Sequence, residues 1–464
     1  MPHRNVLPPA LEAALVEVVG RDHVLTDPAL RGGFERDWTG RFGGPSLAVI
    51  RPGTAAEVAA VLAEASRQRL PVVLQGGNTG LVGGGVPRGG ELLVTLRRLD
   101  GIGAVDTAVR RIRAGAGATL ATVAAAARGA GLEVGVDLAS RDAATLGGLV
   151  ATDAGGLHEL AHGSMGHQVE ALELARIDGR VGSAGPAELV DLIGSEGTLA
   201  AITEVTVRLL PQLPQVATVL VGVSDIDAAV ALTAQVRAAE LGLVAAELVM
   251  ADGLDLATRH LGVAPPFVPA PPAAVLLEAR GPRDPLDRLA EVVEAAGGVE
   301  GVVAAADSTD RRRLWALREA HAEAISTLGV PHKLDVVVPD ERLAGFVRRV
   351  GERVRDVDPS ARVIVFGHLG VGDLHVNVVG PPPDDERVDD AVLGLVAELG
   401  GDVAGEHGAG IAKAAWLRRT RPAAELEAIL ARKAAWDPDG LLGPGVIPAA
   451  RARAHVAGSP TIER

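Results

Sequence analysis

The sequence predicts a mixed α/β and α+β protein built from more than one domain. Its 464 residues suffice for two to four domains at roughly 100–200 residues each. Helix and strand signals alternate from about residue 54 to about Pro211, as in an α/β domain. The segment PQLP at 211–214 marks a boundary, and a second α/β stretch follows it.

Individual elements follow from the spacing of apolar residues. Residues 54–70 have helical spacing, and Pro71-Val-Val-Leu predicts a short buried strand that leads into a glycine-rich loop. The segment APPFVPAPPAA at 264–274 predicts an exposed connection. Helices are expected at 383–398 and 413–434, and a mobile tail is expected after about Ala450.

Composition narrows the class of protein. The formal charge of −14 argues against nucleic-acid binding, which needs a basic surface. The absence of cysteine excludes disulfides, thiolate nucleophiles and iron–sulfur clusters, so redox chemistry would need a bound organic cofactor. The amino terminus lacks the pattern of a secretory signal, and no run of 18 apolar residues occurs. We therefore expect a cytoplasmic protein, with peripheral membrane attachment left open.

One glycine pattern is deceptive. RIRAGAGATL at 111–120 resembles a dinucleotide-binding turn, but Leu120 stands where the third glycine belongs. No acidic residue ends a following strand to hold a ribose. We interpret this segment as a tight turn between a strand and a helix over 119–128.

The loop QGGNTGLVGGG at 75–85 carries a stronger signal. Six glycines in eleven residues cost conformational entropy and add no packing. Such a loop suits backbone N–H groups that converge on an anion such as a diphosphate. The alternative for this segment alone is a flexible surface loop.

Three further segments specify the kind of site. They read DLASRDAATLGGLVATDAGG at 137–156, GSEGTLAAITE at 194–204 and DGLLGPG at 439–445. With the glycine loop, in this order, they resemble the FAD-binding (PCMH-type) domain of vanillyl-alcohol-oxidase type flavoproteins. The nearest resemblance is to the branch of D-lactate dehydrogenases, glycolate oxidase flavoprotein subunits and D-2-hydroxyglutarate dehydrogenases. It extends from about Ala48 to about Pro448.

The resemblance implies a set of flavin contacts. The glycine loop would wrap the pyrophosphate. The 137–156 segment would line the isoalloxazine and ribityl chain, and the 194–204 segment would lie near the adenine end. In that order, these residues are Gly76, Gly77, Asn78, Thr79, Gly80 and Leu81; Ser140, Thr145, Gly148 and Gly155; Gly197 and Ile202. Some relatives tether flavin through a histidine, but Asn78 occupies that position, so non-covalent FAD is expected. Leu138, Arg141-Asp142 and His162 depart from the family pattern.

A histidine pair predicts a second site. In RVIVFGHLGVGDLHVNVV at 362–379, two β-rich runs flank a turn, and pairing across a hairpin could put His368 and His375 on one face. Two imidazoles and a carboxylate, with Glu406 as the candidate, form a common divalent-metal set. Two hydrogen-bonded core histidines are the alternative.

The resemblance favours the metal. GHLGVGDLHVNV and AGEHGAGIAK resemble signatures of the same branch, which implies His368, His375 and Glu406 as ligands of a divalent ion. Ligation by two nitrogens and one oxygen suits Zn²⁺ or Mn²⁺. The resemblance implies His407 as the proton acceptor. Val371 and Asp373 replace the usual Asp and Asn, and both are expected in the turn.

Cations are expected at the substrate carboxylate. Arg318 and Lys333 lie in contexts that resemble the family's substrate-binding arginine and lysine, and a surface salt bridge is the alternative for each. Asn377 is expected to be a further substrate contact, on the same strand face as His375. Ala322 stands where some dicarboxylate-specific relatives carry a hydroxyl, which weakens the case for D-2-hydroxyglutarate itself.

The resulting prediction is a PCMH-type FAD-binding domain plus an α/β cap domain with an antiparallel sheet. The expected boundaries are 1–211 for the FAD domain, 212–412 for the cap and metal domain, 413–450 for a helical segment packing on the FAD domain, and 451–464 for the tail. The expected reaction converts a D-2-hydroxy acid of the D-lactate, glycolate or D-2-hydroxyglutarate class to the 2-oxo acid. Electrons would pass to a quinone, an electron-transfer flavoprotein or a cytochrome, and a homodimer is left open.

Two rival functions remain at this point. The first is an oxygen-using flavin oxidase of another alcohol or sugar, which would not need the metal set. The second is a flavin-bearing subunit of an electron-transfer complex, which would be expected to lose His407 and the ligands. This chain keeps all of them.

Overall fold

The computed structural model describes residues 7–446, so the predicted tail at 451–464 lies outside the described residues. The described chain forms two compact units. The first contains residues 7–155, 164–212 and 406–446, and the second contains residues 156–163 and 213–405. The predicted boundary near 211 agrees with this division. Residues 156–163, expected in the FAD domain, belong to the second unit, and residues 406–412, expected in the cap domain, belong to the first.

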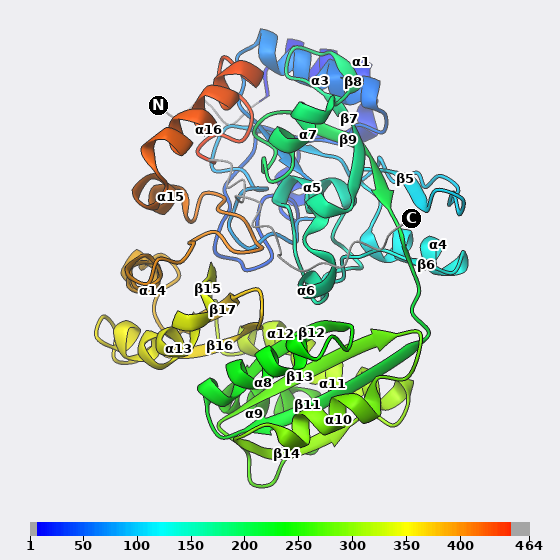
Figure 1. The fold of residues 1–464 in the computed structure, drawn as a ribbon. Coiled ribbons are helices and arrows are strands. Elements are labelled where there is room, and N and C mark those ends of the chain that lie inside the picture. Colours follow the sequence, from blue (N-terminus) through cyan, green and yellow to red (C-terminus); the bar gives the residue numbers. More distant parts are fainter. Residues whose placement is uncertain (1–6, 447–464) are drawn as a thin grey trace. The chain divides into compact units, whose positions relative to one another are not determined.

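The first unit contains a four-stranded sheet in the order β1-β2-β4-β3, a four-stranded antiparallel sheet in the order β5-β9-β7-β8, and a two-stranded sheet of β10 and β6. Figure 1 draws most of it in blue to teal, with the last helices in orange and red. Its strands are β1 (Val24–Leu25), β2 (Ala48–Ile50), β3 (Val72–Gln75), β4 (Leu92–Thr95), β5 (Arg111–Gly115), β6 (Leu132–Glu133), β7 (Val169–Ala175), β8 (Val181–Ser183), β9 (Ala201–Arg208) and β10 (Leu210–Pro211). Its α-helices are α1 (Pro9–Val19), α2 (Pro28–Arg31), α3 (Ala55–Arg67), α4 (Leu120–Gly129), α5 (Leu146–Thr152), α7 (Pro186–Leu192), α15 (Ala414–Thr420) and α16 (Ala423–Trp436), with 3₁₀ turns η1 (Arg21–His23) and η2 (Met165–His167).

Helix α3 shows how local sequence sets an element of this unit. The Thr54 side chain caps the amide of Glu57, and the Glu57 carboxylate accepts from the amide of Gly53 at 2.7 Å. Val58, Val61 and Leu62 are buried at helical spacing, in one core with β2 and β4. The helix predicted over 54–70 and the strand after it are therefore present.

Two other predictions concern turns and breaks. The Gly-Ala-Gly segment is a tight turn between β5 and α4, as predicted. Glycine is needed at position 117 because a Cβ there would lie 2.3 Å from the Leu96 carbonyl oxygen. The helix predicted over 413–434 is wrong in one respect, since it is two helices, α15 and α16. Pro422 has no amide proton to continue α15 and holds Arg421 in an extended conformation.

The second unit is built on a seven-stranded sheet in the order β14-β11-β13-β12-β16-β17-β15, in which each described pair is antiparallel. Figure 1 shows it in green to yellow. Its strands are β11 (Gln215–Val223), β12 (Leu243–Met250), β13 (Ala273–Gly281), β14 (Val299–Ala304), β15 (His332–Val337), β16 (Arg362–His368) and β17 (Asp373–Val379). Its helices are α6 (Glu159–His162), α8 (Ile226–Ala238), α9 (Ala251–Leu261), α10 (Leu286–Ala295), α11 (Ser308–Glu319), α12 (His321–Ser326), α13 (Asp340–Arg355) and α14 (Glu386–Glu398).

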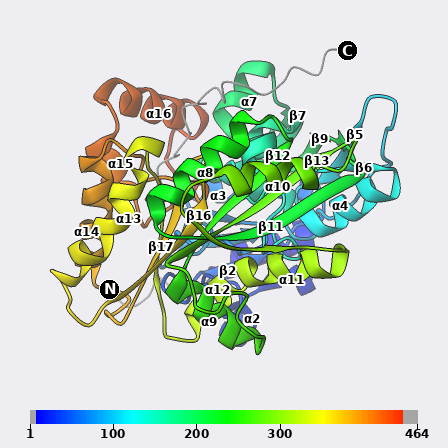
Figure 2. The same ribbon diagram turned by 60° about the horizontal axis from the view of Figure 1, so that its bottom comes forward.

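Helices cover both faces of this sheet. Helices α8, α10, α13 and α14 pack on one face, while α9 and α11 pack on the other, with α12 against α9. Figure 2 shows α8 and α10 on one side of β11 and α9, α11 and α12 on the other. The antiparallel cap sheet predicted from the sequence is confirmed, and α14 confirms the helix expected over 383–398.

Candidate functional site

The loop after β3 is shaped by close contacts between backbones in the first unit. A Cβ on Gly76 would lie 2.4 Å from the Thr145 Oγ1, and a Cβ on Gly77 would lie 2.0 Å from the Ala143 carbonyl oxygen. At Gly77 the neighbouring atoms are backbone, so a larger residue would displace residues 143–144, whereas at Gly76 the neighbour is the Thr145 hydroxyl, which would have to rotate away. Gly77 is therefore required by packing, as well as by any ligand the loop binds.

Polar contacts hold this loop in place. The Arg97 guanidinium donates to the carbonyl oxygens of Gly76 and Gly77. Asn78 adopts a left-handed conformation with φ 57°, and its Nδ2 donates to the Arg36 carbonyl oxygen at 2.8 Å. The side chain that replaces a tethering histidine thus serves to anchor the loop.

A buried hydroxyl beside the loop lacks a partner. Thr145 is 2% exposed and precedes α5, but its side chain does not cap that helix. Its Oγ1 has no hydrogen-bond partner within residues 7–446. A backbone loop with an unpartnered hydroxyl beside it fits a cofactor rich in hydrogen-bond acceptors, as FAD is.

The other predicted flavin residues all belong to the first unit. Gly148 lies beside Gly76, and Gly197, with φ 70°, packs against Leu74 of β3. The rest differ in burial: Gly155 and Ile202 are buried, Thr79, Leu81 and Ser140 are half-buried, and Gly80 is exposed.

The second site lies on one face of four neighbouring strands in the second unit. Glu247 is opposite His368, His368 is opposite Asp373, and Lys333 is opposite Asn377 in the strand registers. Opposed residues in an antiparallel pair share a face, as do residues two apart along a strand. That face carries Glu247 on β12, His368 on β16, Asp373, His375 and Asn377 on β17, and Lys333 and Asp335 on β15.

The predicted hairpin forms, but the two histidines are not directly opposite each other. His375 is opposite Phe366, so the two histidines are diagonal neighbours on the same face. The expectation that Asp373 lies in the turn is wrong, because Asp373 begins β17 and pairs with His368. Val371 does lie in the turn.

The two imidazoles face each other, and a carboxylate lies behind each one. The Nε2 atoms of His368 and His375 are 3.2 Å apart. The His368 Nδ1 is 2.6 Å from the Glu247 Oε1, and the His375 Nδ1 is 2.7 Å from the Asp335 Oδ1. Because a carboxylate only accepts, each Nδ1 carries a proton, which leaves each Nε2 with a lone pair when the ring is neutral.

This arrangement fits one cation bound by both imidazole rings. Facing lone pairs repel, so the pair needs either a proton between its members or a positive ion. Two nitrogens bound to one tetrahedral zinc at about 2.0–2.1 Å lie about 3.3–3.4 Å apart, close to the distance observed here. A carboxylate on the second nitrogen of a metal-binding histidine is also the usual outer partner.

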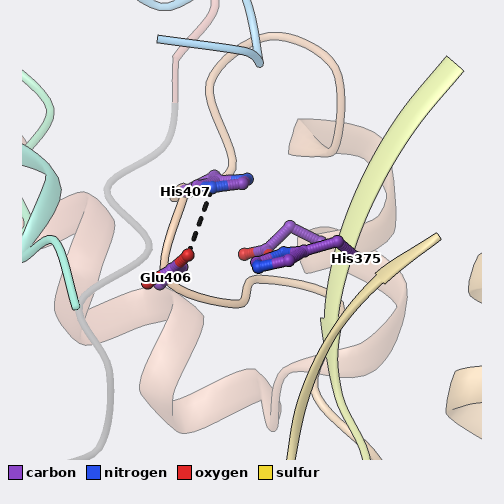
Figure 3. Close-up of side chains that lie close together, drawn as sticks. His375, Glu406 and His407 are labelled. Carbon is purple, nitrogen blue, oxygen red and sulfur yellow. Dashed lines mark hydrogen bonds and ion pairs between the residues drawn. The ribbon is translucent and has the colours of Figure 1, made fainter. Parts of the chain in front are cut away.

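Further ligand atoms are close by. Asp335, His375, Glu406 and His407 each offer a ligand atom, and these atoms lie within 4.8 Å of one another. Glu406 and His407 follow directly on Gly405, whose amide donates to the Asp335 carbonyl oxygen at 3.4 Å. Figure 3 shows His375 projecting towards Glu406 and His407, and the contact between the last two joins Nε2 to Oε1 at 3.3 Å.

Asp335 is better suited to orienting a ligand than to binding the ion. Its Oδ1 accepts from the His375 Nδ1, and its Oδ2 lies against Gly405, where an added Cβ would be 2.2 Å away. Glycine at 405 is what allows the 402–406 segment to approach this carboxylate. The same position would place a Cβ 2.9 Å from the Asp373 Oδ1.

The predicted substrate cations are both in polar surroundings. The Arg318 Nε donates to the Glu247 Oε2 at 2.6 Å, and the guanidinium lies over the Phe366 ring, 4.6 Å from its centroid. The Lys333 Nζ is 3.4 Å from the Asn377 Oδ1. Burial lowers the pKa of Lys333 to about 8.

Glu247 is the residue that sequence reasoning missed. It is 1% exposed and bridges the predicted substrate arginine and a predicted metal ligand. Burial by itself raises its pKa, but His368 and Arg318 lower the pKa below the ordinary value. No local pattern in VAAELVM signals this role, which depends on pairing between distant strands.

Two other residues had a signal without an assigned role. Asp335 stands in the segment PHKLDVVVP beside Lys333, and Glu196 stands in GSEGTL. Glu196 adopts φ 50°, and its carboxylate accepts from the amides of Ala409 and Gly410 at 3.0 and 2.7 Å. It thereby holds the turn that follows His407.

The fold and its family matches define the class of this protein. Residues 46–185 match the family described as FAD binding domain, and residues 213–447 match the C-terminal domain of FAD linked oxidases. The protein is therefore an FAD-dependent oxidoreductase with a PCMH-type FAD-binding domain. The chain belongs to the FAD linked oxidase family, as the resemblance in its motifs predicted.

Individual relatives agree with this assignment. The chain is 33% identical over 457 residues to the D-2-hydroxyglutarate dehydrogenase of Xanthomonas citri pv. viticola, covering 93% of this chain and 95% of the relative. It is 32% identical over 458 residues to the mitochondrial D-2-hydroxyglutarate dehydrogenase of Bos taurus, covering 93% and 82%. Among solved structures, p-cresol methylhydroxylase with substrate bound gives a TM-score of 0.77 at 13% identity, covering 94% of this chain and 96% of that chain. No helix within residues 7–446 is both long and apolar enough to cross a membrane.

Proposed function

We propose that this protein oxidises a D-2-hydroxy acid to the corresponding 2-oxo acid, using non-covalent FAD and a divalent cation, and passes the electrons to an external acceptor. The observation that carries the proposal is the pair of imidazole Nε2 atoms 3.2 Å apart, each ring bound to a carboxylate through its Nδ1. The hydroxyl proton of a 2-hydroxy acid, as of any alcohol, must leave as the carbon is oxidised, and a cation held by such a pair would make that proton more acidic.

The cation would be held by His368, His375 and Glu406. When bound, it supplies Lewis acidity that makes the substrate hydroxyl more acidic. Two nitrogens and one carboxylate oxygen favour Zn²⁺ or Mn²⁺ over Mg²⁺ or Ca²⁺. His407, with a side chain 29% exposed, is the proposed acceptor of the hydroxyl proton.

The substrate carboxylate would be met by Lys333, Arg318 and Asn377. Lys333 and Asn377 share the sheet face that carries the histidines, and Arg318 reaches the same face from α11. A buried ammonium and guanidinium provide strong, charge-assisted hydrogen bonds to a carboxylate. FAD would take the two electrons at the site formed by the loop over residues 76–81 and the residues around Thr145 and Gly197.

D-2-Hydroxyglutarate is the first substrate to test. The relatives that match over nine-tenths of this chain carry that name. Ala322, in place of a hydroxyl-bearing residue, argues for testing D-lactate and glycolate beside it. An L-2-hydroxy acid series tests the assigned handedness.

The decisive experiment joins metal content to turnover. FAD-loaded protein is assayed with a dye acceptor and each hydroxy acid, before and after chelation and after addition of Zn²⁺ or Mn²⁺. Chelation should abolish turnover without releasing FAD, and the cation should restore turnover. His368→Ala should lose the stoichiometric ion measured by mass spectrometry.

A matched histidine variant controls for nonspecific effects. His260, on α9, contacts the exposed Glu323 at 3.8 Å, so His260→Ala should keep both the ion and the activity. Full activity in wild-type protein that contains no stoichiometric divalent ion would reject cation-assisted chemistry. The two histidines would then be hydrogen-bonded core residues.

A further inference from the structure

One carboxylate connects the two parts of the proposed substrate site. Glu247 lies on β12, directly opposite His368 on β16, and Arg318 approaches it from α11. Its Oε1 is 2.6 Å from the His368 Nδ1, and its Oε2 is 2.6 Å from the Arg318 Nε. Each oxygen is therefore committed to a different partner.

We propose that Glu247 is a positioning residue that orients His368 for cation binding and holds Arg318 for the substrate carboxylate, so that the two functions depend on one buried side chain. The inference rests on the proposed function, because it assumes that His368 binds a cation and Arg318 faces substrate. Glu247 itself contacts Arg318 and the far side of the His368 ring. It acts through those residues.

The first role is to fix the tautomer of His368. An ionised carboxylate accepts at Nδ1, so the proton stays there and the Nε2 lone pair points towards His375. Without this partner the ring could protonate at Nε2 or rotate away. Asp335 does the same for His375, at 2.7 Å.

The second role is to fix Arg318. The guanidinium is held at its Nε by Glu247 and on its face by Phe366, 4.6 Å from the ring centroid. Arg318 is 6% exposed, so an unpaired charge there would be costly. A guanidinium held by Nε still presents its planar fork of Nη donors, which is the geometry that binds a carboxylate.

Glutamine cannot replace this carboxylate, although it has nearly the same shape. In Glu247→Gln, an amide oxygen facing His368 would direct the NH₂ group at the Arg318 N–H, donor against donor. The opposite orientation would direct the NH₂ group at His368 and favour the wrong tautomer. Either orientation disrupts one of the two partners.

The same sheet face offers a matched control. Glu278 on β13 is also 1% exposed, and it accepts from Trp315 Nε1 at 2.7 Å and from Arg280 Nε at 2.9 Å. Glu278→Gln removes a buried charge beside an arginine, as Glu247→Gln does. It differs in leaving His368 and His375 untouched.

The test uses FAD-loaded protein and makes two measurements. Cation affinity is measured by competition for Zn²⁺ against a chromophoric chelator, and KM for the hydroxy acid is measured at saturating cation. Loss of an outer partner typically weakens metal binding by about 10- to 100-fold. We expect a loss of that size in Glu247→Gln, together with a raised KM, while Glu278→Gln retains wild-type affinity and KM. If Glu247→Gln lowers FAD content or melting temperature more than Glu278→Gln does, Glu247→Asp is used instead. It keeps the charge but is one methylene too short to reach both partners, so the same losses are expected.

The outcomes separate this inference from the proposed function. Wild-type protein that binds one cation, with equal affinity in the Glu247 variants, overturns the positioning role and leaves the proposed function standing. Weaker cation binding in the Glu247 variants, with an unchanged KM, overturns the proposed role of Glu247 towards Arg318. Wild-type protein that binds no cation rejects the cation-assisted function, and the role of Glu247 towards His368 with it.

Discussion

Replacing Gly77 with alanine tests whether the loop after β3 has a unique backbone path. The added Cβ would lie 2.0 Å from the Ala143 carbonyl oxygen, 2.9 Å from its carbonyl carbon and 3.1 Å from the Ala144 Cα. All three are backbone atoms, so no side-chain rotation relieves the contact. Either the loop or the 143–144 backbone must move.

The magnitude follows from what holds that backbone. Ordinary contact begins at 3.4 Å, so a displacement of more than 1 Å is needed. The amides of Ala143 and Ala144 donate to the Ser140 carbonyl oxygen at 2.9 and 2.8 Å, and such a shift would break at least one of these bonds. Overpacking costs about 1–3 kcal/mol and a lost hydrogen bond about 1 kcal/mol, which gives about 2–4 kcal/mol.

The assay compares Gly77→Ala with Gly80→Ala in the apoprotein. A Cβ on Gly80 meets nothing within 4 Å, so that variant should keep the wild-type melting temperature. Gly77→Ala should melt at least about 4 °C lower, given about 2–4 °C per kcal/mol for a unit of this size. If the loop moves instead, the strain appears as FAD affinity lowered by about thirtyfold or more. Wild-type melting temperature and wild-type FAD affinity in Gly77→Ala would refute the steric reasoning.

Because burial lowers the pKa of Lys333 to about 8, its ammonium is lost as pH rises through that value. We expect kcat/KM for the hydroxy acid to fall above about pH 8, and Lys333→Arg to move this fall to higher pH; an unchanged profile would exclude Lys333 from substrate binding. His407→Ala should keep FAD and cation by spectroscopy and mass spectrometry while kcat falls about 10²- to 10⁴-fold, and rate loss caused by a missing cation would assign it as a ligand instead. With Asn78 in place of a tethering histidine, acid or heat should release all FAD into the supernatant, whereas yellow precipitate would mean a covalent bond.

The helices and strands that local patterns predicted have causes that are themselves local. The apolar spacing of α3 and its Thr54 cap are visible in the sequence, and so are the two β-rich runs of the histidine hairpin. The break between α15 and α16 was also readable, because Pro422 stands in the middle of the predicted helix.

The parts that could not be predicted depend on distant pairing. Glu247 meets His368 only because β12 and β16 are neighbours, and the two lie 121 positions apart in the chain. Nothing in the sequence near either residue encodes that register. The hairpin register has the same character, since it depends on how Gly370 and Gly372, both at positive φ, shape the turn.

The return of residues 406–446 to the first unit has a consequence for the synthesis of this protein. Leu442 pairs with Val72 of β3, and the Lys433 ammonium donates to the Thr198 and Leu442 carbonyl oxygens at 2.7 Å. The first unit therefore cannot be completed until residues 406–446 have left the ribosome. Residues 213–405, which form most of the second unit, are contiguous and emerge earlier. A chain that stops near residue 405 would contain the strands of the histidine pair, but it would leave the edge of β3 without Leu442 and the Thr198 carbonyl without Lys433.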